Sequence, residues 1–153
     1  MKTILLVDDD SAVRRMLSRL LSEEHYNVIP ATNGVEALDL AQTAPVDLVL
    51  LDLNLPMKDG WQTFEQLATR DPFLPVVIIT ARSNQIFPAL ASGAGALMEK
   101  PLDLPSLLQT IRDLLAEPAQ VRLARMAGKP ASFRYLPPKK QEALSEGKNR
   151  GES

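Results

Sequence analysis

The segment Asp47 to Leu53 reads Asp-Leu-Val-Leu-Leu-Asp-Leu and is almost continuously apolar up to the aspartate at position 52. Such a run is typical of a central strand in a parallel sheet, which helices cover on both faces. A carboxylate at the end of a buried strand is costly unless it is paired or bound to a cation. The segment therefore predicts an α/β fold and a functional role for Asp52.

Short apolar runs and amphipathic helices alternate five times along the first 117 residues. The helical period is clear where apolar side chains recur three and four positions apart after Ser11. We expect strands near 3–7, 27–31, 47–53, 76–80 and 96–99, and helices near 12–25, 35–44, 61–71, 85–92 and 104–115, with Ser11 as the N-cap of the first helix. Right-handed crossovers then give a doubly wound, five-stranded parallel sheet with helices on both faces.

The charge is distributed unevenly and predicts two regions. Residues 1–117 carry nine Lys+Arg and sixteen Asp+Glu, a formal charge of −7, whereas residues 118–153 carry eight and three, or +5. We expect a folded domain over 1–117 and a basic, proline-containing, flexible tail over 118–153. A short helix over 119–127 fits the apolar residues there. The tail is too short and too poor in periodic apolar residues for a helix-turn-helix output domain.

Composition excludes several classes of site. The chain has no cysteine, so a disulfide, a thiolate zinc site and a cysteine nucleophile are impossible, and a metal would be bound by oxygen. His25 is the single histidine, so a histidine metal site or a Ser-His-Asp triad has little support. No segment approaches the roughly 18 uninterrupted apolar residues of a membrane helix, and no signal peptide is recognisable. We expect a cytoplasmic protein with no membrane partner.

Polar residues follow four of the expected strands, where a parallel sheet binds its ligands. They are Asp8 and Asp9, Asp52, Thr80 and Lys100. Two like unit charges about 4 Å apart repel by about 4 kcal/mol at an effective dielectric constant of about 20. Three clustered carboxylates therefore predict a bound cation or protonation, and Mg²⁺ is a hard ion that prefers oxygen ligands.

Each of these residues also has an ordinary structural interpretation. Asp8, Asp9 and Asp10 are typical of a solvated turn that caps a helix, and we assign Asp10 to the start of the helix. Thr80 alone is a common strand residue, and Lys100 alone is usually a surface lysine. Their joint placement favours a site over four unrelated features.

The motifs that carry this pattern resemble the receiver domain of two-component response regulators, of the stand-alone, chemotaxis-regulator-like kind. They are Asp8-Asp9, then Asp52-Leu53-Asn54-Leu55-Pro56-Met57-Lys58-Asp59-Gly60, Thr80-Ala81 and Lys100-Pro101. The resemblance covers about residues 1–117. It implies the flavodoxin-like strand order 2-1-3-4-5, with a site beside the first and third strands.

The resemblance also implies a metal site. Asp9 and Asp52 would be direct carboxylate ligands of Mg²⁺ or Mn²⁺, the backbone carbonyl of Asn54 a third ligand, and Asp8 a ligand through water. One or two carboxylates together with waters and phosphate oxygens is the usual Mg²⁺ environment.

By the same resemblance, Asp52 is the phosphoacceptor. Lys100 would pair with the phosphoryl oxygens, and Thr80 would contact the phosphoryl group and act as the switch. The Lys100–Pro101 peptide bond is expected to be cis. Many receivers carry an aromatic switch residue three positions before the lysine, where this chain has Leu97, which puts the usual aromatic readout in doubt.

The implied function is a phosphoacceptor in a phosphorelay, with a sensor histidine kinase or a histidine phosphotransfer protein upstream and a protein target downstream. Phosphorylation would reshape the face formed by 85–92, 96–99 and 104–115, which is also a candidate homodimer surface. We expect slow self-dephosphorylation and no enzymatic turnover of an external substrate, because Asn54 stands where aspartate-based phosphatases carry their acid/base. The alternatives are a DNA-binding regulator that uses the basic tail, although we do not expect nucleic acid as a partner, and a degenerate receiver that binds without phosphorylation.

Overall fold

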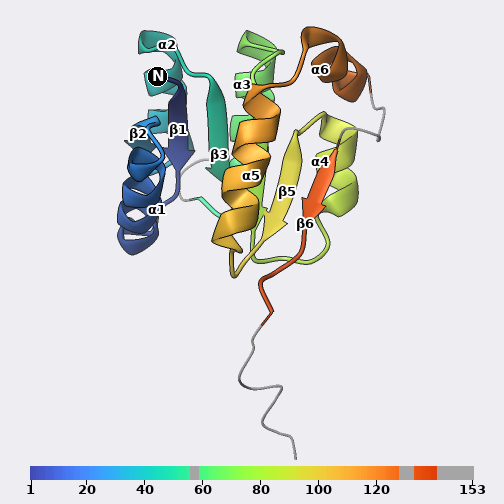
Figure 1. Cartoon of the computed structure of the whole chain (residues 1–153). Helices are drawn as coiled ribbons and strands as arrows, with labels where there is room; N and C mark the ends of the chain where they lie inside the picture. The colour runs from blue at the N-terminus through green and yellow to red at the C-terminus, as the bar shows by residue number, and fades with distance from the viewer. Residues whose placement is uncertain (56–58, 128–132, 141–153) are drawn as a thin grey trace, which may run out of the picture.

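The structure is a computed structural model that describes residues 1–55, 59–127 and 133–140. Strands and helices alternate through most of the chain (Figure 1). The strands are β1 (Thr3–Val7), β2 (Asn27–Ala31), β3 (Leu48–Asp52), β4 (Val76–Thr80), β5 (Ala96–Glu99) and β6 (Arg134–Leu136). The helices are α1 (Ser11–Glu23), α2 (Gly34–Thr43), α3 (Gly60–Arg70), α4 (Ile86–Ser92), α5 (Leu104–Leu115) and α6 (Ala119–Met126).

The strands form one parallel sheet in the order β2-β1-β3-β4-β5-β6. The predicted doubly wound fold and the order 2-1-3-4-5 are therefore confirmed, and the sheet has six strands where five were expected. The additional strand, β6, lies in the segment expected to be a flexible tail. It has three residues, two of them exposed, so it carries neither the apolar run nor the alternation that predicts a strand.

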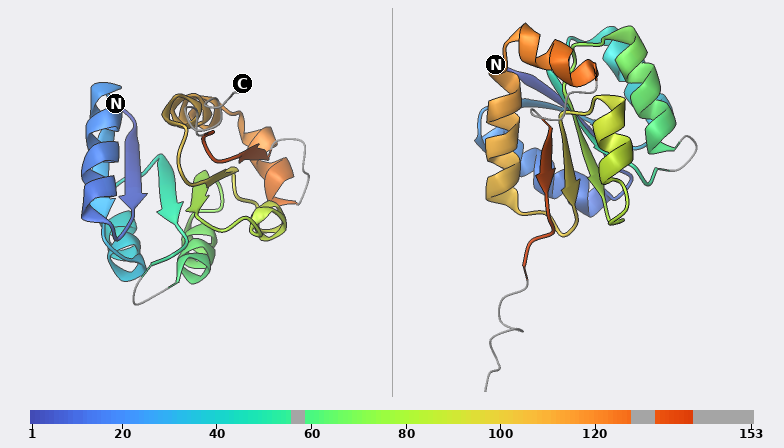
Figure 2. Two further views of the ribbon diagram at one scale, coloured as in Figure 1. Left: turned by 90° about the horizontal axis from the view of Figure 1, so that it is seen from below. Right: turned by 90° about the vertical axis from the view of Figure 1, so that its right-hand side faces the viewer.

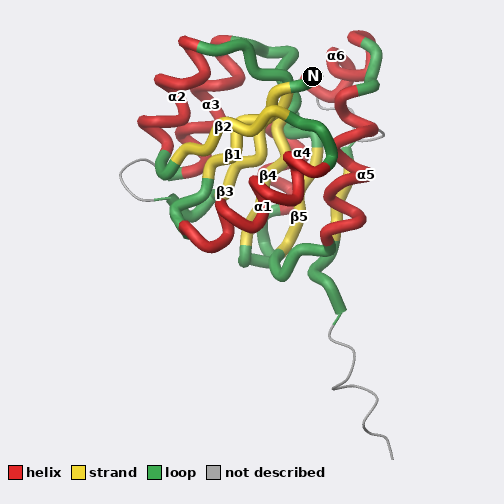
Figure 3. The backbone as a smooth tube through the Cα atoms, turned by 60° about the vertical axis from the view of Figure 1, so that its left-hand side comes forward, coloured by secondary structure: helices red, strands yellow, loops and turns green. Residues whose placement is uncertain are grey.

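Two helical layers bury the sheet (Figure 2). The helices α2, α3 and α4 cover one face, and α1 and α5 cover the other. Every residue of β1, β3, β4 and β5 is buried, as expected for strands covered on both faces. In Figure 3 these strands form the yellow centre of the molecule, flanked by the red helices. None of the helices in the described ranges combines the length and the hydropathy that a membrane span requires.

The topology brings the ends of the strands together. Because all strands are parallel, their carboxyl ends lie at the same edge of the sheet, which is the lower end in Figure 1. The register pairs Val7 with Leu51 and Asp52 with Ile79. Residues that directly follow β1, β3 and β4 are consequently neighbours in space, although more than 70 residues separate the first from the last.

Candidate functional site

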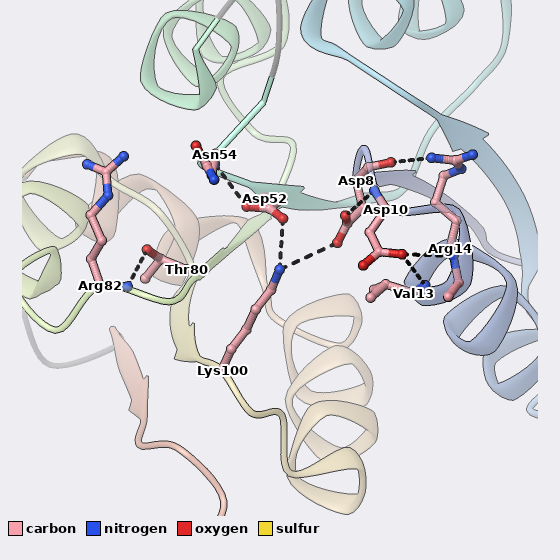
Figure 4. A network of polar contacts seen from close by, with 10 residues as sticks. Asp8, Asp10, Val13, Arg14, Asp52, Asn54, Thr80, Arg82 and Lys100 are labelled. Atoms are coloured by element: carbon pink, nitrogen blue, oxygen red, sulfur yellow. Dashed lines mark hydrogen bonds and ion pairs between the residues drawn. The ribbon is translucent and has the colours of Figure 1, made fainter.

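Asp8 and Asp52 form the buried part of an acidic cluster at the carboxyl edge of the sheet (Figure 4). Asp8 directly follows β1, and Asp52 is the last residue of β3. Their side chains are only 2% and 4% exposed, whereas Asp9 is exposed. One ligand atom from each of Asp8, Asp9 and Asp52 lies within 4.8 Å of the others. The structure thus brings together the three carboxylates that the sequence predicts to meet.

Backbone amides and one ammonium group hold the two buried carboxylates in place. The amide of Asp10 donates to Oδ1 of Asp8 at 2.9 Å, and the amide of Asn54 donates to Oδ1 of Asp52 at 2.9 Å. Lys100 Nζ donates to Oδ2 of Asp52 at 2.9 Å and lies 3.9 Å from Oδ2 of Asp8. Such charge-assisted bonds fix the orientation of a carboxylate more firmly than neutral ones do.

Residues at the start of α1 fix the backbone that carries the acidic cluster. Asp10, which we assigned to the start of this helix, is its N-cap, because its Oδ1 accepts hydrogen bonds from the amides of Ala12 and Val13. Ser11, the expected N-cap, is the first residue of the helix. The Arg14 guanidinium donates to the backbone carbonyl of Asp8 at 2.8 Å. The capping bonds and the arginine together fix the backbone that presents Asp8 and Asp9. The contribution of Arg14 was not predicted, since an arginine on the polar face of a helix gives no signal of its own.

The charges of the site shift the pKa values of its groups. Burial raises the pKa of the Asp8 carboxyl, the Asp10 amide bond and Lys100 oppose this effect, and the negative charge of Asp52 adds to it. Burial alone would lower the pKa of Lys100, but the hydrogen bond to Asp52 and the charges of Asp52, Asp8 and Asp9 raise it overall. Lys100 is therefore a firmly protonated cation facing a cluster that has more negative charge than one ammonium can neutralise.

The donor set fits a hard divalent cation. The cluster offers carboxylate oxygens from two buried residues and one exposed residue, and the described residues contribute no sulfur ligand. Each buried carboxylate uses one oxygen to accept a backbone amide. The exposed side of the cluster, at Asp9, leaves room for water, which Mg²⁺ usually retains when it binds to proteins.

Thr80 ends β4 and is 2% exposed. Its Oγ1 accepts a hydrogen bond from the backbone amide of Arg82 at 3.0 Å. The register places Thr80 opposite Glu99, the residue before Lys100, and the amide of Lys100 donates to the carbonyl of Thr80 at 2.8 Å. The predicted switch residue and the predicted lysine are therefore joined through their backbones.

Three further residues of the expected site lie as follows. The Lys100–Pro101 peptide bond is cis. Leu97 is completely buried in β5, within the core under α4. Asn54 follows β3 by two residues and belongs to the described part of the loop, whereas Pro56, Met57 and Lys58 of the predicted motif lie outside the described residues.

Gly60 is needed where α3 meets the loop after β3. Its amide donates to the carbonyl of Leu53 at 3.0 Å. A Cβ atom at this position would lie 2.3 Å from Cα and 2.7 Å from the carbonyl oxygen of Leu53. Only glycine allows this close approach. Gly60 belongs to the predicted motif, but its close contact with Leu53 arises only in the folded chain and could not be predicted from the sequence.

Glu99 is a buried residue of the region that the sequence analysis did not single out. It is 5% exposed, and its Oε2 has no hydrogen-bond partner among the described residues. The signal was present, because Glu99 follows the apolar run of β5 in the way that Asp52 follows that of β3.

Comparison with known proteins identifies the family. The model of the response regulator receiver domain matches residues 4–112 of this chain. Response regulator MprA of Mycobacterium sp. (strain KMS) is 42% identical over 114 residues, which are 73% of this chain and 50% of that protein. Transcriptional regulatory protein GlrR of Escherichia coli (strain K12) is 36% identical over 118 residues, or 76% of this chain and 27% of that protein.

These two relatives are longer proteins, of which the chain spans about half and about a quarter. A solved structure extends over most of the fold instead. Response regulator protein TrrA from Thermotoga maritima, in complex with Mg(2+)-BeF, superposes with a TM-score of 0.70 at 29% identity, over 74% of this chain and 99% of that one. The matched family model and the confirmed strand order agree with the resemblance seen in the motifs. This chain belongs to the response regulator receiver domain family.

Proposed function

We propose that this protein is a phosphoacceptor of a two-component phosphorelay and that Asp52 carries the phosphoryl group. One observation supports this assignment above the others. Asp52 ends a central strand as a buried carboxylate, within one acidic cluster with Asp8 and Asp9, and the Lys100 ammonium lies 2.9 Å from it. A carboxylate that an ammonium and a backbone amide hold in a fixed orientation can act as a nucleophile.

The metal of this site is Mg²⁺, or Mn²⁺ in its place. Asp9, Asp52 and the backbone carbonyl of Asn54 are the proposed direct ligands, and Asp8 binds through water. The TrrA structure, which contains Mg(2+)-BeF, supports this choice. When bound, the ion neutralises charge on the phosphoryl group and on the carboxylates around it.

In the transfer step, an oxygen of the Asp52 carboxylate attacks the phosphorus of a phosphohistidine on the partner protein. An O–P bond forms and the P–N bond breaks, and the electron pair of that bond leaves with the imidazole nitrogen. Lys100 holds a phosphoryl oxygen as a point charge during the transfer. The product is an aspartyl phosphate, which water hydrolyses slowly. An external substrate is not turned over, because Asn54 cannot transfer a proton.

Thr80 responds to the new group after transfer. Its hydroxyl accepts from the Arg82 amide in the structure and can at the same time donate to a phosphoryl oxygen. The contact biases the loops after β4 and β5 towards one of two arrangements. Leu97 is an aliphatic side chain at the usual aromatic switch position, so its repacking is the expected local response.

A sensor histidine kinase or a histidine phosphotransfer protein is the proposed upstream partner, and a downstream protein is the proposed target. The face formed by α4, β5 and α5 is the proposed surface for the target or for a homodimer. In this chain β6 pairs with β5 along that face, so residues 118–153 do not form a wholly separate tail. We assign the protein to the cytoplasm, where such kinases present their phosphohistidine.

DNA binding is the second candidate function. GlrR is named a transcriptional regulatory protein, and this weakens our expectation that nucleic acid is not a partner. The described arginines of the basic tail argue against DNA binding through these side chains, whereas Lys139 and Lys140 are exposed. Arg125 is bonded to Glu117, Arg122 to two backbone carbonyls and Arg134 to Asp113. These guanidinium groups already form hydrogen bonds or ion pairs within the protein. Lys129 lies outside the described residues.

The decisive experiment is intact-protein mass after incubation with Mg²⁺ and acetyl phosphate. The native chain should gain one phosphoryl group, while Asp52→Asn and a metal-free sample should gain none. A native chain that gains nothing would refute the phosphoacceptor assignment and favour the degenerate receiver that binds without phosphorylation. Salt-sensitive DNA binding that disappears when 118–153 are deleted would instead support the second candidate function.

A further inference from the structure

The C-terminal segment 133–140 is bonded to the backbone that carries Lys100. At one end of the segment, the Arg134 amide donates to the Gly95 carbonyl at 3.3 Å. At the other end, the Lys139 amide donates to the Pro101 carbonyl at 2.8 Å. Because Pro101 directly follows Lys100, a shift of the backbone at Lys100 would also displace the carbonyl that the segment bonds.

A second connection runs through side chains on one face of the sheet. Thr80 is paired with Glu99 in the register, and Leu97 is paired with Tyr135 of β6. Paired residues of parallel strands, and residues two apart in one strand, point to the same face. Thr80, Glu99 and Tyr135 therefore form a line across β4, β5 and β6, beneath the layer that contains α4.

The middle member of this line has an unused acceptor. Glu99 is 5% exposed, and its Oε2 has no hydrogen-bond partner among the described residues. The neighbouring Tyr135 is 41% exposed. Loss of hydration, a side-chain hydrogen bond to Glu99 and the negative charge of Glu99 raise the pKa of the Tyr135 phenol, so the two groups already interact. A buried acceptor without a donor is unfavourable, and the Tyr135 hydroxyl is the donor within reach.

We propose that segment 133–140 changes its position when Asp52 is phosphorylated. In this proposal, Glu99 links Thr80 to Tyr135. This inference rests on the proposed phosphorylation of Asp52. When Thr80 and Lys100 engage the phosphoryl group, the packing beside Glu99 changes, and Tyr135, which already interacts with Glu99, moves inwards towards the unused Oε2 of that carboxylate. The segment then docks more tightly on β5. Because coupling is reciprocal, docking of the segment also stabilises the phosphorylated form.

The test uses the two tyrosines of the chain, Tyr26 and Tyr135. The full-length protein is labelled with 3-fluorotyrosine and followed by ¹⁹F NMR, with the signals assigned from Tyr26→Phe and Tyr135→Phe. Mg²⁺ and fluoroberyllate then mimic the phosphoryl group, and the bound fluoroberyllate has its own ¹⁹F signal. Occupancy of the site and movement of Tyr135 are thus read from one spectrum.

The Tyr135 signal should shift by more than its line width when fluoroberyllate binds, and the Tyr26 signal should stay in place. Glu99→Leu keeps a buried side chain of similar size without the acceptor, so it should bind fluoroberyllate and lose most of the Tyr135 shift. Asp113→Asn is the matched control, because it removes the ion pair to Arg134 but not the line of side chains. It should retain the shift.

The outcomes separate this inference from the function on which it rests. Bound fluoroberyllate with an unmoved Tyr135 signal would overturn the coupling and leave the phosphoacceptor assignment intact. An unchanged Tyr135 shift in Glu99→Leu would overturn the route through Glu99. If the native chain shows no bound fluoroberyllate signal, the proposed function fails and this inference fails with it.

Discussion

Lys100 Nζ lies 2.9 Å from Oδ2 of Asp52, although Asp52 ends β3, Lys100 directly follows β5, and β4 lies between these two strands. The same ammonium is 3.9 Å from Oδ2 of Asp8. Lys100 therefore spans the width of the acidic cluster and partly neutralises it when no metal is bound. The negative charge that Lys100 does not neutralise favours the binding of a cation.

Asp8→Asn should stabilise the metal-free protein. The folded state raises the pKa of Asp8 above its ordinary value of 3.8, so the folded state binds this proton more tightly than the unfolded state does. Ionised Asp8 therefore costs stability at neutral pH, and the neutral amide removes that cost. We expect Tm to rise by about 2–4 °C, the shift that about 1 kcal/mol gives in a domain of this size.

Thermal scans with and without Mg²⁺ check this prediction. The native chain should gain stability from Mg²⁺, because a ligand that binds only the folded state raises Tm. Asp8→Asn should gain less, since it has lost one carboxylate of the cluster. A variant that is destabilised without metal would show that Asp8 is a structural residue and not a costly part of a metal site.

Lys100→Met should lower stability in a pH-dependent manner. The pKa of Lys100 is raised in the folded state above its ordinary value of 10.5. The stabilising contribution is therefore fully present below about pH 10.5 and is lost as the pH rises through the folded-state pKa. Because the side chain is 31% exposed, we expect a difference of about 1–2 kcal/mol at pH 7.

Urea unfolding of the native chain and Lys100→Met at pH 7, 9 and 11, without metal, measures this difference. The difference in stability should be the same at pH 7 and 9 and should begin to narrow above about pH 10.5. A gap that persists unchanged at pH 11 would mean that the aliphatic stem of Lys100, and not its charge, stabilises the fold.

The site residues that could be predicted from the sequence are those that lie at the ends of strands. Asp52 and Thr80 end apolar runs in a parallel fold, so their convergence follows from topology alone. Glu99 obeys the same rule and could have been predicted. β6 could not, because its three residues owe their conformation to pairing with β5 and not to a pattern of their own. The need for glycine at position 60 likewise arises from a tertiary contact with Leu53.

Gly60→Ala should damage the loop that leads from Asp52 to α3. Its Cβ would lie 2.3 Å from Leu53 Cα, which is backbone and cannot rotate away. The matched control is Gly95→Ala, whose Cβ would meet the Cδ atoms of Leu114 at 3.0 and 3.1 Å. Those atoms are the ends of a side chain and can shift. We expect losses of about 3 kcal/mol or more at position 60 and about 1 kcal/mol at position 95.

Chemical unfolding of both glycine variants at pH 7 measures the two losses. A Gly60→Ala protein as stable as the Gly95→Ala protein would mean that the loop after β3 can relax away from α3. In that case the backbone of Leu53 would not hold Asn54 in a fixed position.

Arg125→Met should be far more destabilising than Arg134→Met, although each removes one close ion pair formed by residues 118–153. Arg125 is 3% exposed, and its two terminal nitrogens donate to the Glu117 carboxylate at 2.8 and 2.7 Å. Removing it leaves the Glu117 carboxylate, which is 9% exposed, with only the longer 3.9 Å ion pair to Arg122 Nε, so we expect a cost of about 3 kcal/mol. The Arg134–Asp113 pair is 43% and 32% exposed, so its loss should cost at most about 1 kcal/mol.

The double variant Arg125→Met with Glu117→Leu removes both charges and should recover most of the loss, because an apolar pair of similar volume needs no counter-charge. Urea unfolding of the three variants separates these effects, and equal losses for the two single variants would mean that the contact between α6 and the end of α5 is solvated.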